Sequence, residues 1–330
     1  MKIITGGAGF IGSAISWRLN QLGIKDILLV DADVAGTKKN NLENLLYSDL
    51  IDKDNFIKKI SLDDISFKVE TIYHMGACSS TTEQDMEYLK ANNFEYSKHL
   101  AKWSIRNSVR FIYASSGATY GDGSMGFEDD EKLIPKLTQL NKYGLSKQMF
   151  DIWLLENKML DKVVGLKYFN VFGPNENHKG DMRSMVNKSY SQIEKTGKMQ
   201  LFKSYRNEYK DGEQKRDFIY VKDAVEMTIF FDGINQIGYN KNGIYNIGAG
   251  RASSWNEMAY ALFKALGKEP VIEYVEMPDN IKNQYQYYTE ANITKLRRAG
   301  YEKPVMSLEE SVIDYVVNYL MKDKYLSIND

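Results

Sequence analysis

The chain has 330 residues, with 43 Lys and Arg against 44 Asp and Glu, so its formal net charge is −1. This balance argues against nonspecific nucleic-acid binding, which needs a basic face. The single cysteine, Cys78, excludes an intrachain disulfide, and three widely separated histidines exclude the spacing of a zinc site. A serine-hydrolase GxSxG elbow is also missing, which leaves an enzyme that borrows its reactivity from an organic cofactor.

No segment of the sequence predicts export or membrane insertion. The first residues reach glycine at once and provide no apolar core for a signal peptide. The longest apolar-rich stretches are interrupted by charges and fall short of the ~18 residues that a membrane-spanning helix needs. We therefore expect a cytoplasmic protein without a membrane partner.

Short apolar runs alternate with amphipathic stretches through the first half of the chain. The runs predict strands at Lys2–Thr5, Asp26–Asp31, Val69–Met75, Val109–Ser115 and Val163–Tyr168. The stretches between the later runs predict helices at Asp85–Asn107 and Asn141–Met159. This alternation predicts an α/β fold: a doubly wound parallel sheet of the Rossmann type with helices on both faces.

The second half is more mixed. We expect strands at Asp217–Val221 and Tyr245–Gly248, a charged surface loop or hairpin at Lys203–Lys215, and helices at Met185–Thr196, Asp223–Asn235, 254–267, 291–299 and 307–322. The expected division interleaves two domains. Residues 1–172 plus 216–250 form the dinucleotide-binding domain, and 173–215 plus 251–330 form a smaller α/β substrate domain.

A glycine-rich loop follows the first predicted strand. Gly6, Gly9 and Gly12 give a GxxGxxG pattern between a strand and a helix, and Asp31 ends the next strand. In this context the glycines permit a tight turn, close approach of the pyrophosphate and close helix packing, while the acidic residue binds the adenosine ribose. Plain turn glycines are the alternative interpretation. The context favours a dinucleotide site.

The choice between NAD and NADP stays open from the residues alone. Asp31 by itself favours NAD, because a carboxylate repels the 2′-phosphate of NADP. Lys38, Lys39 and Lys53 offer positive charge for that phosphate. A solvated run of charges explains these lysines equally well.

A tyrosine and a lysine four residues apart mark a second site. Tyr143 and Lys147 share one face of a predicted helix, and Ser116 follows the end of an earlier strand. A phenol is a poor base near neutral pH, and we expect the nearby cation to lower the pKa of Tyr143. The three residues predict a proton-transfer unit that acts on a hydroxyl group, with Ser116 orienting that hydroxyl.

Four segments together resemble the extended short-chain dehydrogenase/reductases that act on nucleotide sugars: the glycine loop, the Ser116/Tyr143/Lys147 set, Tyr168–Pro174 and Arg216–Asp223. More narrowly, His74–Thr82, Ala114–Gly121 and Asn177–Gly180 resemble the ADP-L-glycero-D-manno-heptose 6-epimerase family. The resemblance extends over nearly the whole chain.

This resemblance implies an activity. Bound NADP would oxidise C6 of the heptose and return the same hydride to the other face of the ketone, a step of lipopolysaccharide core heptose biosynthesis. Inversion needs acid and base groups on two faces, and the resemblance implies Tyr143 for one and Lys179 for the other. It also implies a homo-oligomer, a pentamer, and ADP-heptose as the substrate.

The resemblance further assigns binding residues. For the cofactor it implies Gly6, Gly9, Phe10, Ile11, Gly12, Asp31, Ala32, Lys38, Lys53, Met75, Gly76, Ala77, Cys78, Ser79, Asn92, Lys147, Val171 and Lys179. For the substrate it implies Ser116, Asn170, Asp181, Lys188, Phe202, Lys203, Ser204, Tyr205, Arg216 and Tyr285. Arg216 has an independent rationale, since a guanidinium binds a diphosphate in bidentate fashion; an ordinary ion pair with Asp217 is the alternative.

Some positions depart from the family pattern. Ala32 replaces a common Asn, Met75 a common Glu, and Asp181 and Lys188 a common Ser and His. A UDP-hexose 4-epimerase remains an alternative because it also needs only a Ser, a Tyr and a Lys, and a non-catalytic NADP-sensing protein of the same fold is a further alternative. A dehydratase is disfavoured, because Gly117 and the next residue occupy the place of its acidic pair.

Overall fold

A seven-stranded parallel sheet forms the centre of the computed structural model, which describes residues 1–32, 34–233, 241–282 and 285–330. The strand order is β11-β6-β5-β4-β1-β2-β3, and every neighbouring pair is parallel. The bounds are β1 Lys2–Thr5, β2 Ile27–Asp31, β3 Asp49–Asp52, β4 Thr71–His74, β5 Arg110–Ser116, β6 Val164–Tyr168 and β11 Gly243–Ile247. The predicted Rossmann-type fold is confirmed.

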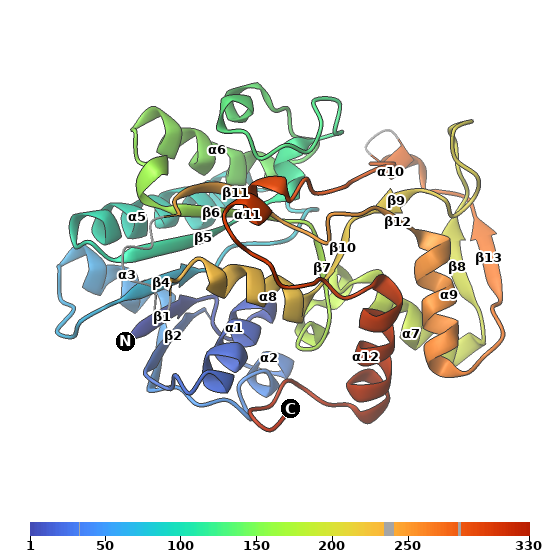
Figure 1. Ribbon diagram of the computed structural model, residues 1–330, viewed down its shortest axis with the longest axis horizontal. Coiled ribbons are helices and arrows are strands. Elements are labelled where there is room, and N and C mark those ends of the chain that lie inside the picture. The colour runs from blue at the N-terminus through green and yellow to red at the C-terminus, as the bar shows by residue number, and fades with distance from the viewer. Residues whose placement is uncertain (33, 234–240, 283–284) are drawn as a thin grey trace.

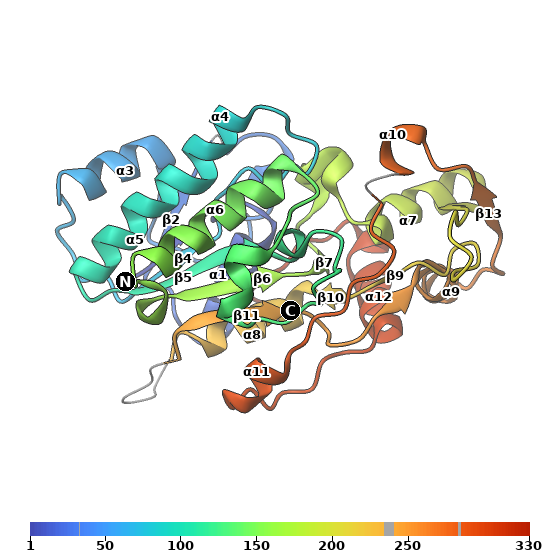
Figure 2. The ribbon, with the colours of Figure 1, turned by 90° about the horizontal axis from the view of Figure 1, so that it is seen from above.

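Helices cover both faces of this sheet (Figures 1 and 2). Helices α3 (Lys53–Ser61), α5 (Tyr96–Arg106) and α6 (Lys142–Glu156) lie on one face, and α1 (Phe10–Gln21) and α8 (Val221–Phe230) lie on the other. The strands alternate accordingly: Ile3 and Leu28 enter the core under α3, α5 and α6, whereas Ile4 and Leu29 enter the core under α1 and α8.

The predicted elements hold with shifts at their ends. The long helix predicted at Asp85–Asn107 is α4 (Met86–Leu89), a π-helical stretch at Lys90–Glu95 and then α5. Helix α8 starts at Val221 and takes the last residue of a predicted strand; of the helix predicted to Asn235, residues 234–235 lie outside the described residues. Among the strands of the central sheet and the helices that cover it, the prediction missed β3 and α3.

A second group of elements packs beside the carboxyl edge of the sheet (Figure 1). It contains three two-stranded sheets: β7 (Asn170–Phe172) with β10 (Phe218–Tyr220), β9 (Lys215–Arg216) with β12 (Ser253–Ser254), and β8 (Met199–Phe202) with β13 (Ile272–Val275). The remaining helices are α2 Thr37–Asn40, α7 Met185–Thr196, α9 Trp255–Leu266, α10 Asp279–Lys282, α11 Thr294–Arg298 and α12 Leu308–Asn318. Helices α9 and α12 pack on each other and join this group to the core under α1 and α8.

The strand order reverses between β1 and β4, which places a crevice at their carboxyl ends. The chain continues from β1 to β2 and β3 on one side and returns to β4 on the other. The hydroxyl of Thr5, at the end of β1, lies 2.6 Å from His74 Nδ1 at the end of β4 and accepts a hydrogen bond from Gly76 N. Ligands of open α/β sheets bind at such a reversal, and the glycine loop begins there.

Candidate active site

The glycine loop is shaped for close approach of backbone to a ligand. Gly6 has a φ of +66°, and a Cβ there would lie 2.7 Å from Gly76 N. A Cβ on Gly12 would lie only 2.1 Å from the Gly6 carbonyl oxygen, so the first turn of α1 can pack on the loop only without a side chain. Helix α1 begins at this loop, whose residues line the cavity, and the unpaired N–H groups of a helix start favour an anion.

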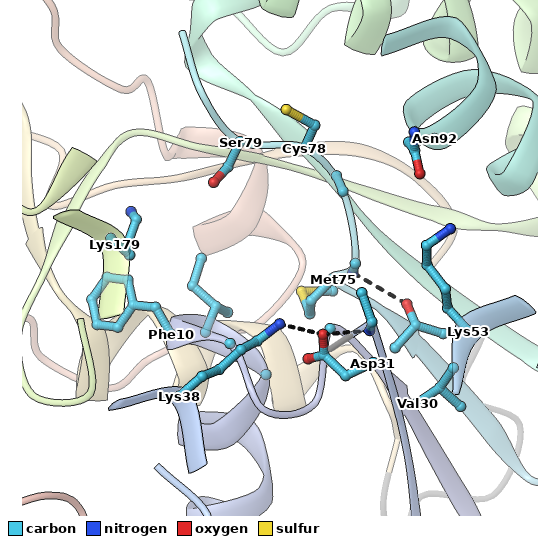
Figure 3. A pocket seen from close by; sticks show the side chains of 18 of the residues that line it. Phe10, Val30, Asp31, Lys38, Lys53, Met75, Cys78, Ser79, Asn92 and Lys179 are labelled. Carbon is cyan, nitrogen blue, oxygen red and sulfur yellow. Dashed lines mark hydrogen bonds and ion pairs between the residues drawn. The ribbon is translucent and has the colours of Figure 1, made fainter. Parts of the chain in front are cut away.

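Asp31 ends β2 and is fixed from three directions. Its carboxylate accepts hydrogen bonds from Ala8 N at 2.9 Å and from Ala32 N at 2.7 Å, and it forms an ion pair with Lys38 Nζ. Figure 3 shows Lys38 reaching across to this carboxylate. Lys38 and Asp31 therefore balance each other, so neither group acts as an isolated charge on the adenosine ribose.

These residues border a cavity of about 460 Å³ at the reversal point (Figure 3). Sixteen of the predicted cofactor residues line it: Gly6, Gly9, Phe10, Ile11, Gly12, Asp31, Ala32, Lys38, Lys53, Met75, Gly76, Ala77, Cys78, Ser79, Asn92 and Lys179. Lys147 and Val171 are not among its lining residues. The steric cradle, the cations and the paired carboxylate together fit a nicotinamide dinucleotide.

The predicted proton-transfer residues gather behind the Cys78 wall of this cavity. Ser116 ends β5, and Tyr143 and Lys147 lie in the first turns of α6, whose start is capped by the Asn141 side chain accepting from Gly144 N at 2.7 Å. Lys147 Nζ donates to the Ala114 carbonyl at 2.8 Å. The Ser116 hydroxyl forms a hydrogen bond with Tyr143, and Cys78, which lines the cavity, interacts with both Tyr143 and Lys147.

The pKa of Tyr143 corrects one expectation from the sequence. Burial raises the pKa of Tyr143 above its usual value, and the Ser116 hydroxyl lowers it by a smaller amount. Lys147 is not among the groups that shift the Tyr143 pKa, so the expected lowering of this pKa by the cation was wrong. Burial instead lowers the pKa of Lys147 to about 8, against an opposing effect of Asp151.

Lys179 reaches the cavity from another segment, Asn177–Met182. Its ammonium lies 5.3 Å from the centre of the Phe10 ring, a cation–π distance. Burial lowers the pKa of Lys179, and the nearby Glu176 carboxylate opposes this shift. Glu176 is itself buried and accepts from Ser184 N and from Ser184 Oγ at 2.7 Å, which ties the loop that carries Lys179 to the start of α7.

Arg216 forms a cationic group between aromatic rings. Its guanidinium lies 5.2 Å from the centre of the Tyr285 ring and 5.8 Å from the centre of the Trp255 ring. The rings of Phe202 and Tyr285 pack edge to face, with their centres 6.2 Å apart. The alternative of an ion pair with Asp217 is wrong. That carboxylate instead accepts from three backbone N–H groups, those of residues 249, 250 and 291.

The other predicted substrate residues are spread more widely. Lys203 pairs with Glu276 at 2.7 Å, and the hydroxyl of Tyr205 donates to the same carboxylate. Ser204 N donates to Asp211 at 2.7 Å. Asn170 is exposed on β7. The Lys188 ammonium donates a hydrogen bond to the Asp181 carbonyl at 3.3 Å.

Comparison with known proteins decides the family. The NAD dependent epimerase/dehydratase family matches residues 2–248. The chain belongs to this family. It is 48% identical over 320 residues to an ADP-L-glycero-D-manno-heptose-6-epimerase of Nitratidesulfovibrio vulgaris (strain DP4), covering 97% of this chain and 98% of that one.

Two further relatives carry the same name. The enzyme of Fusobacterium nucleatum is 48% identical over 336 residues, covering 99% of this chain and all of its own. The crystal structure of the Helicobacter pylori enzyme matches with a TM-score of 0.75 and 26% identity, covering 96% of this chain and 95% of that one. Family, fold and full-length coverage therefore agree for this epimerase.

Sequence reasoning missed several residues at the site of this epimerase. The cavity is also lined by Thr5, Val30, Ser80, Tyr88, Tyr96, His178 and Met182. Of these, Ser80 and His178 had a signal in the sequence, because each lies within a segment that resembles the 6-epimerase family. Within the described ranges, no group of three or more His, Cys, Asp or Glu residues could hold a metal ion, and no helix is long and apolar enough to cross a membrane.

Proposed function

We propose that this protein interconverts ADP-D-glycero-D-manno-heptose and ADP-L-glycero-D-manno-heptose by epimerisation at C6, with NADP as its bound cofactor, as a step of lipopolysaccharide core heptose biosynthesis. The carrying observation is the Ser116, Tyr143 and Lys147 group beside a dinucleotide cavity, in a chain 48% identical to 6-epimerases over nearly its full length.

The proposed chemistry divides the proton transfers between two sides of the cavity. The nicotinamide supplies a hydride acceptor that later becomes the donor, so there is no net oxidation. Ser116 holds the C6 hydroxyl by a hydrogen bond while Tyr143 takes its proton and leaves a ketone. Lys147 is held by its hydrogen bond to the Ala114 carbonyl and binds the nicotinamide ribose.

Lys179 is proposed for the opposite face of the ketone. Return of the hydride to that face leaves an alkoxide, and the Lys179 ammonium donates the proton that restores the alcohol. Lys179 then recovers a proton from solvent, or acts as the base in the reverse direction. Burial, which lowers the pKa of Lys179, favours both roles.

NADP is proposed over NAD because Lys38 and Lys53 add positive charge to the cavity wall besides that of Lys179. Lys38 lies beside Asp31 and partly cancels its charge, and Lys53 lies at the start of α3 and also lines the cavity. A 2′-phosphate would gain an ion pair with Lys38 as it displaces the contact to Asp31. The remaining lining residues then hold the adenosine and pyrophosphate.

The ADP of the substrate is proposed to bind at Arg216. A buried guanidinium without a carboxylate partner among the residues described suits the diphosphate, and the rings of Phe202 and Tyr285 suit the base. Asn170, Asp181, Lys188, Lys203, Ser204 and Tyr205 are the further substrate contacts in this proposal. The proposal also keeps the expected domain division: residues 1–172 plus 216–250 bind the dinucleotide, and residues 173–215 plus 251–330 bind the substrate.

One assay tests this function. The purified protein is incubated with ADP-D-glycero-D-manno-heptose, and the configuration at C6 is followed by NMR, with UDP-glucose in a parallel tube. We expect inversion at C6 and an unchanged hexose. Activity on UDP-glucose alone would favour a UDP-hexose 4-epimerase, and bound NADP without turnover of either sugar would favour a cofactor-sensing protein.

Compartment and assembly complete the proposal. The cytoplasm is the proposed compartment, because a chain with a single cysteine, Cys78, cannot form the intrachain disulfides that are common in oxidising compartments. A homo-oligomer, a pentamer by resemblance, is the proposed assembly. Light scattering on the purified protein measures its mass directly.

A further inference from the structure

A histidine with no role in the chemistry above borders the cofactor cavity. His178 lies next to Lys179, and its ring Nδ1 is 3.1 Å from the side-chain nitrogen of Asn41, just after α2. The same Asn41 nitrogen donates to the Ala8 carbonyl of the glycine loop at 2.9 Å. Because a carbonyl oxygen only accepts, the amide atom that faces it must be the nitrogen. The orientation of the Asn41 amide is thereby fixed.

This contact determines where His178 carries its proton. The Asn41 nitrogen is a donor, so Nδ1 must accept, and the proton of the neutral ring is on Nε2. His178 lines the cavity, and beside Asn41 the backbone of Asn175 also interacts with its ring. Asn41 is fully buried, so its amide group is held in place against the His178 ring.

The charges around His178 favour a neutral ring beside an anion. Lys38 faces it from α2, Lys179 from its own segment and Asp31 from β2. Burial, followed by the two lysines, lowers the pKa of His178 to about 4, although the Asn175 backbone and the Asp31 carboxylate oppose this shift. The ring therefore stays uncharged through the physiological pH range. It presents one N–H donor between two ammonium groups, which is a complementary environment for phosphate oxygens.

We propose that His178 is a further cofactor-binding residue, whose Nε2–H donates to a phosphate oxygen of the bound dinucleotide while Asn41 fixes the tautomer. The inference rests on the proposed dinucleotide cofactor. Two phosphates share this chemistry: the pyrophosphate, present in NAD and NADP, and the 2′-phosphate, present in NADP alone.

Binding to protein stripped of nucleotide tests this role without any turnover. Dissociation constants for NADP⁺ and NAD⁺ are measured by titration calorimetry for the wild type, His178→Phe and His178→Gln. Phenylalanine keeps a ring and removes both nitrogens, whereas the glutamine amide nitrogen can occupy the position of Nε2. We expect His178→Phe to weaken NADP⁺ binding roughly 10- to 100-fold, as for loss of a hydrogen bond to a charged group. His178→Gln should stay within about threefold of the wild type.

The two cofactors distinguish the two phosphates. Equal losses for NAD⁺ and NADP⁺ assign the pyrophosphate, and a loss for NADP⁺ alone assigns the 2′-phosphate. A His178→Phe variant that binds NADP⁺ as tightly as the wild type would overturn the role of His178. A wild-type protein that binds neither dinucleotide would instead overturn the proposed function.

Histidine NMR provides a measurement that needs no substitution in the observed sample. The long-range ¹H–¹⁵N spectrum of the wild type should contain an Nε2–H tautomer, assigned to His178 by its loss in His178→Gln. The chain has only three histidines. We expect NADP⁺ to shift this Nε2 resonance. An Nδ1–H tautomer, or a resonance that saturating NADP⁺ leaves in place, would contradict the proposal.

Discussion

The ammonium of Lys167 and the carboxylate of Asp151 form a fully buried ion pair, with Nζ 3.0 Å from Oδ2. Asp151 lies in α6 one turn after Lys147, and Lys167 lies in β6. The same carboxylate accepts from the hydroxyls of Tyr113 at 2.9 Å and Ser115 at 2.7 Å. The Asp151 carboxylate therefore joins the helix that carries Tyr143 and Lys147 to β6 and also to β5, the strand that ends at Ser116.

Asp151→Asn should destabilise the protein strongly, because it leaves the Lys167 charge buried without a partner. We expect a loss of about 3–5 kcal/mol in the free energy of unfolding, measured by urea denaturation. The double variant with Lys167→Met should recover most of this loss. Glu309→Gln is the control, since it breaks an exposed pair with Lys264 and should cost under about 1 kcal/mol. An Asp151→Asn loss as small as the control's would contradict the prediction.

Tyr143→Phe should remove nearly all turnover and leave the cofactor bound. It deletes the hydroxyl that exchanges a proton with C6, and general acid–base catalysis contributes roughly 10²–10⁴-fold. The measurements are the rate of C6 inversion by NMR and the NADP content of the purified variant. Tyr88→Phe removes another hydroxyl from the cavity wall and should retain its rate. A Tyr143→Phe rate within tenfold of the wild type would rule out this residue as the base.

Lys179→Met tests the second face. Methionine preserves much of the side-chain length and cannot transfer a proton, so we expect inversion to slow by about 100-fold or more. Lys179→Arg is the matched variant, because it keeps the positive charge beside Phe10 yet does not release a proton near neutral pH. Both variants should be slow. Normal rates in either one would show that one base serves both faces.

The rate should fall at alkaline pH as Lys147 loses its proton. Burial lowers the pKa of Lys147 to about 8, so the ammonium is mostly present below that pH and is lost as the pH rises through it. We expect an alkaline limb near pH 8 in the profile of kcat/KM. Lys147→Arg keeps its charge at every pH tested, so its lower activity should lack that limb. If kcat/KM falls at the same alkaline pH in both proteins, a group other than Lys147 causes the fall.

Gly12→Ala should abolish cofactor binding. A methyl group there would overlap the Gly6 carbonyl at 2.1 Å and force α1 away from the loop. We expect loss of measurable NADP binding together with a lower melting temperature. Gly267→Ala is the control: its φ of +64° strains the backbone, but nothing lies within 4 Å. That variant should lose about 1 kcal/mol of stability and keep its cofactor.

Local patterns in the sequence identified the elements that build the cofactor loop. The glycine spacing and the strand before it are properties of consecutive residues, so β1, the loop and α1 could be predicted directly. The edge strand β3 was not predicted, because Asp49–Asp52 begins and ends with a carboxylate and contains no fully buried residue. Helix α3 begins directly after β3 and was not predicted either.

The charge pairs of the site depend on tertiary structure and left no signal. Lys38 and Asp31 are seven residues apart, and only the turn between β2 and α2 brings them together. Lys167 stands in an apolar run, where a lysine gives no hint of the carboxylate on α6 that neutralises it. The pKa of Tyr143 was misjudged for a related reason: burial of the phenol outweighs any charge inferred from helical spacing.

The pairing of β6 with β11 has a consequence for synthesis of the chain. Strand β6 ends at Tyr168, but its outer neighbour, β11, begins only at Gly243. A nascent chain that has emerged only to about residue 230 would expose the backbone of β6 along one edge, which is a site for unwanted strand pairing. The intervening 74 residues (169–242) include Arg216 and Lys179. Both must therefore emerge from the ribosome before the sheet can close.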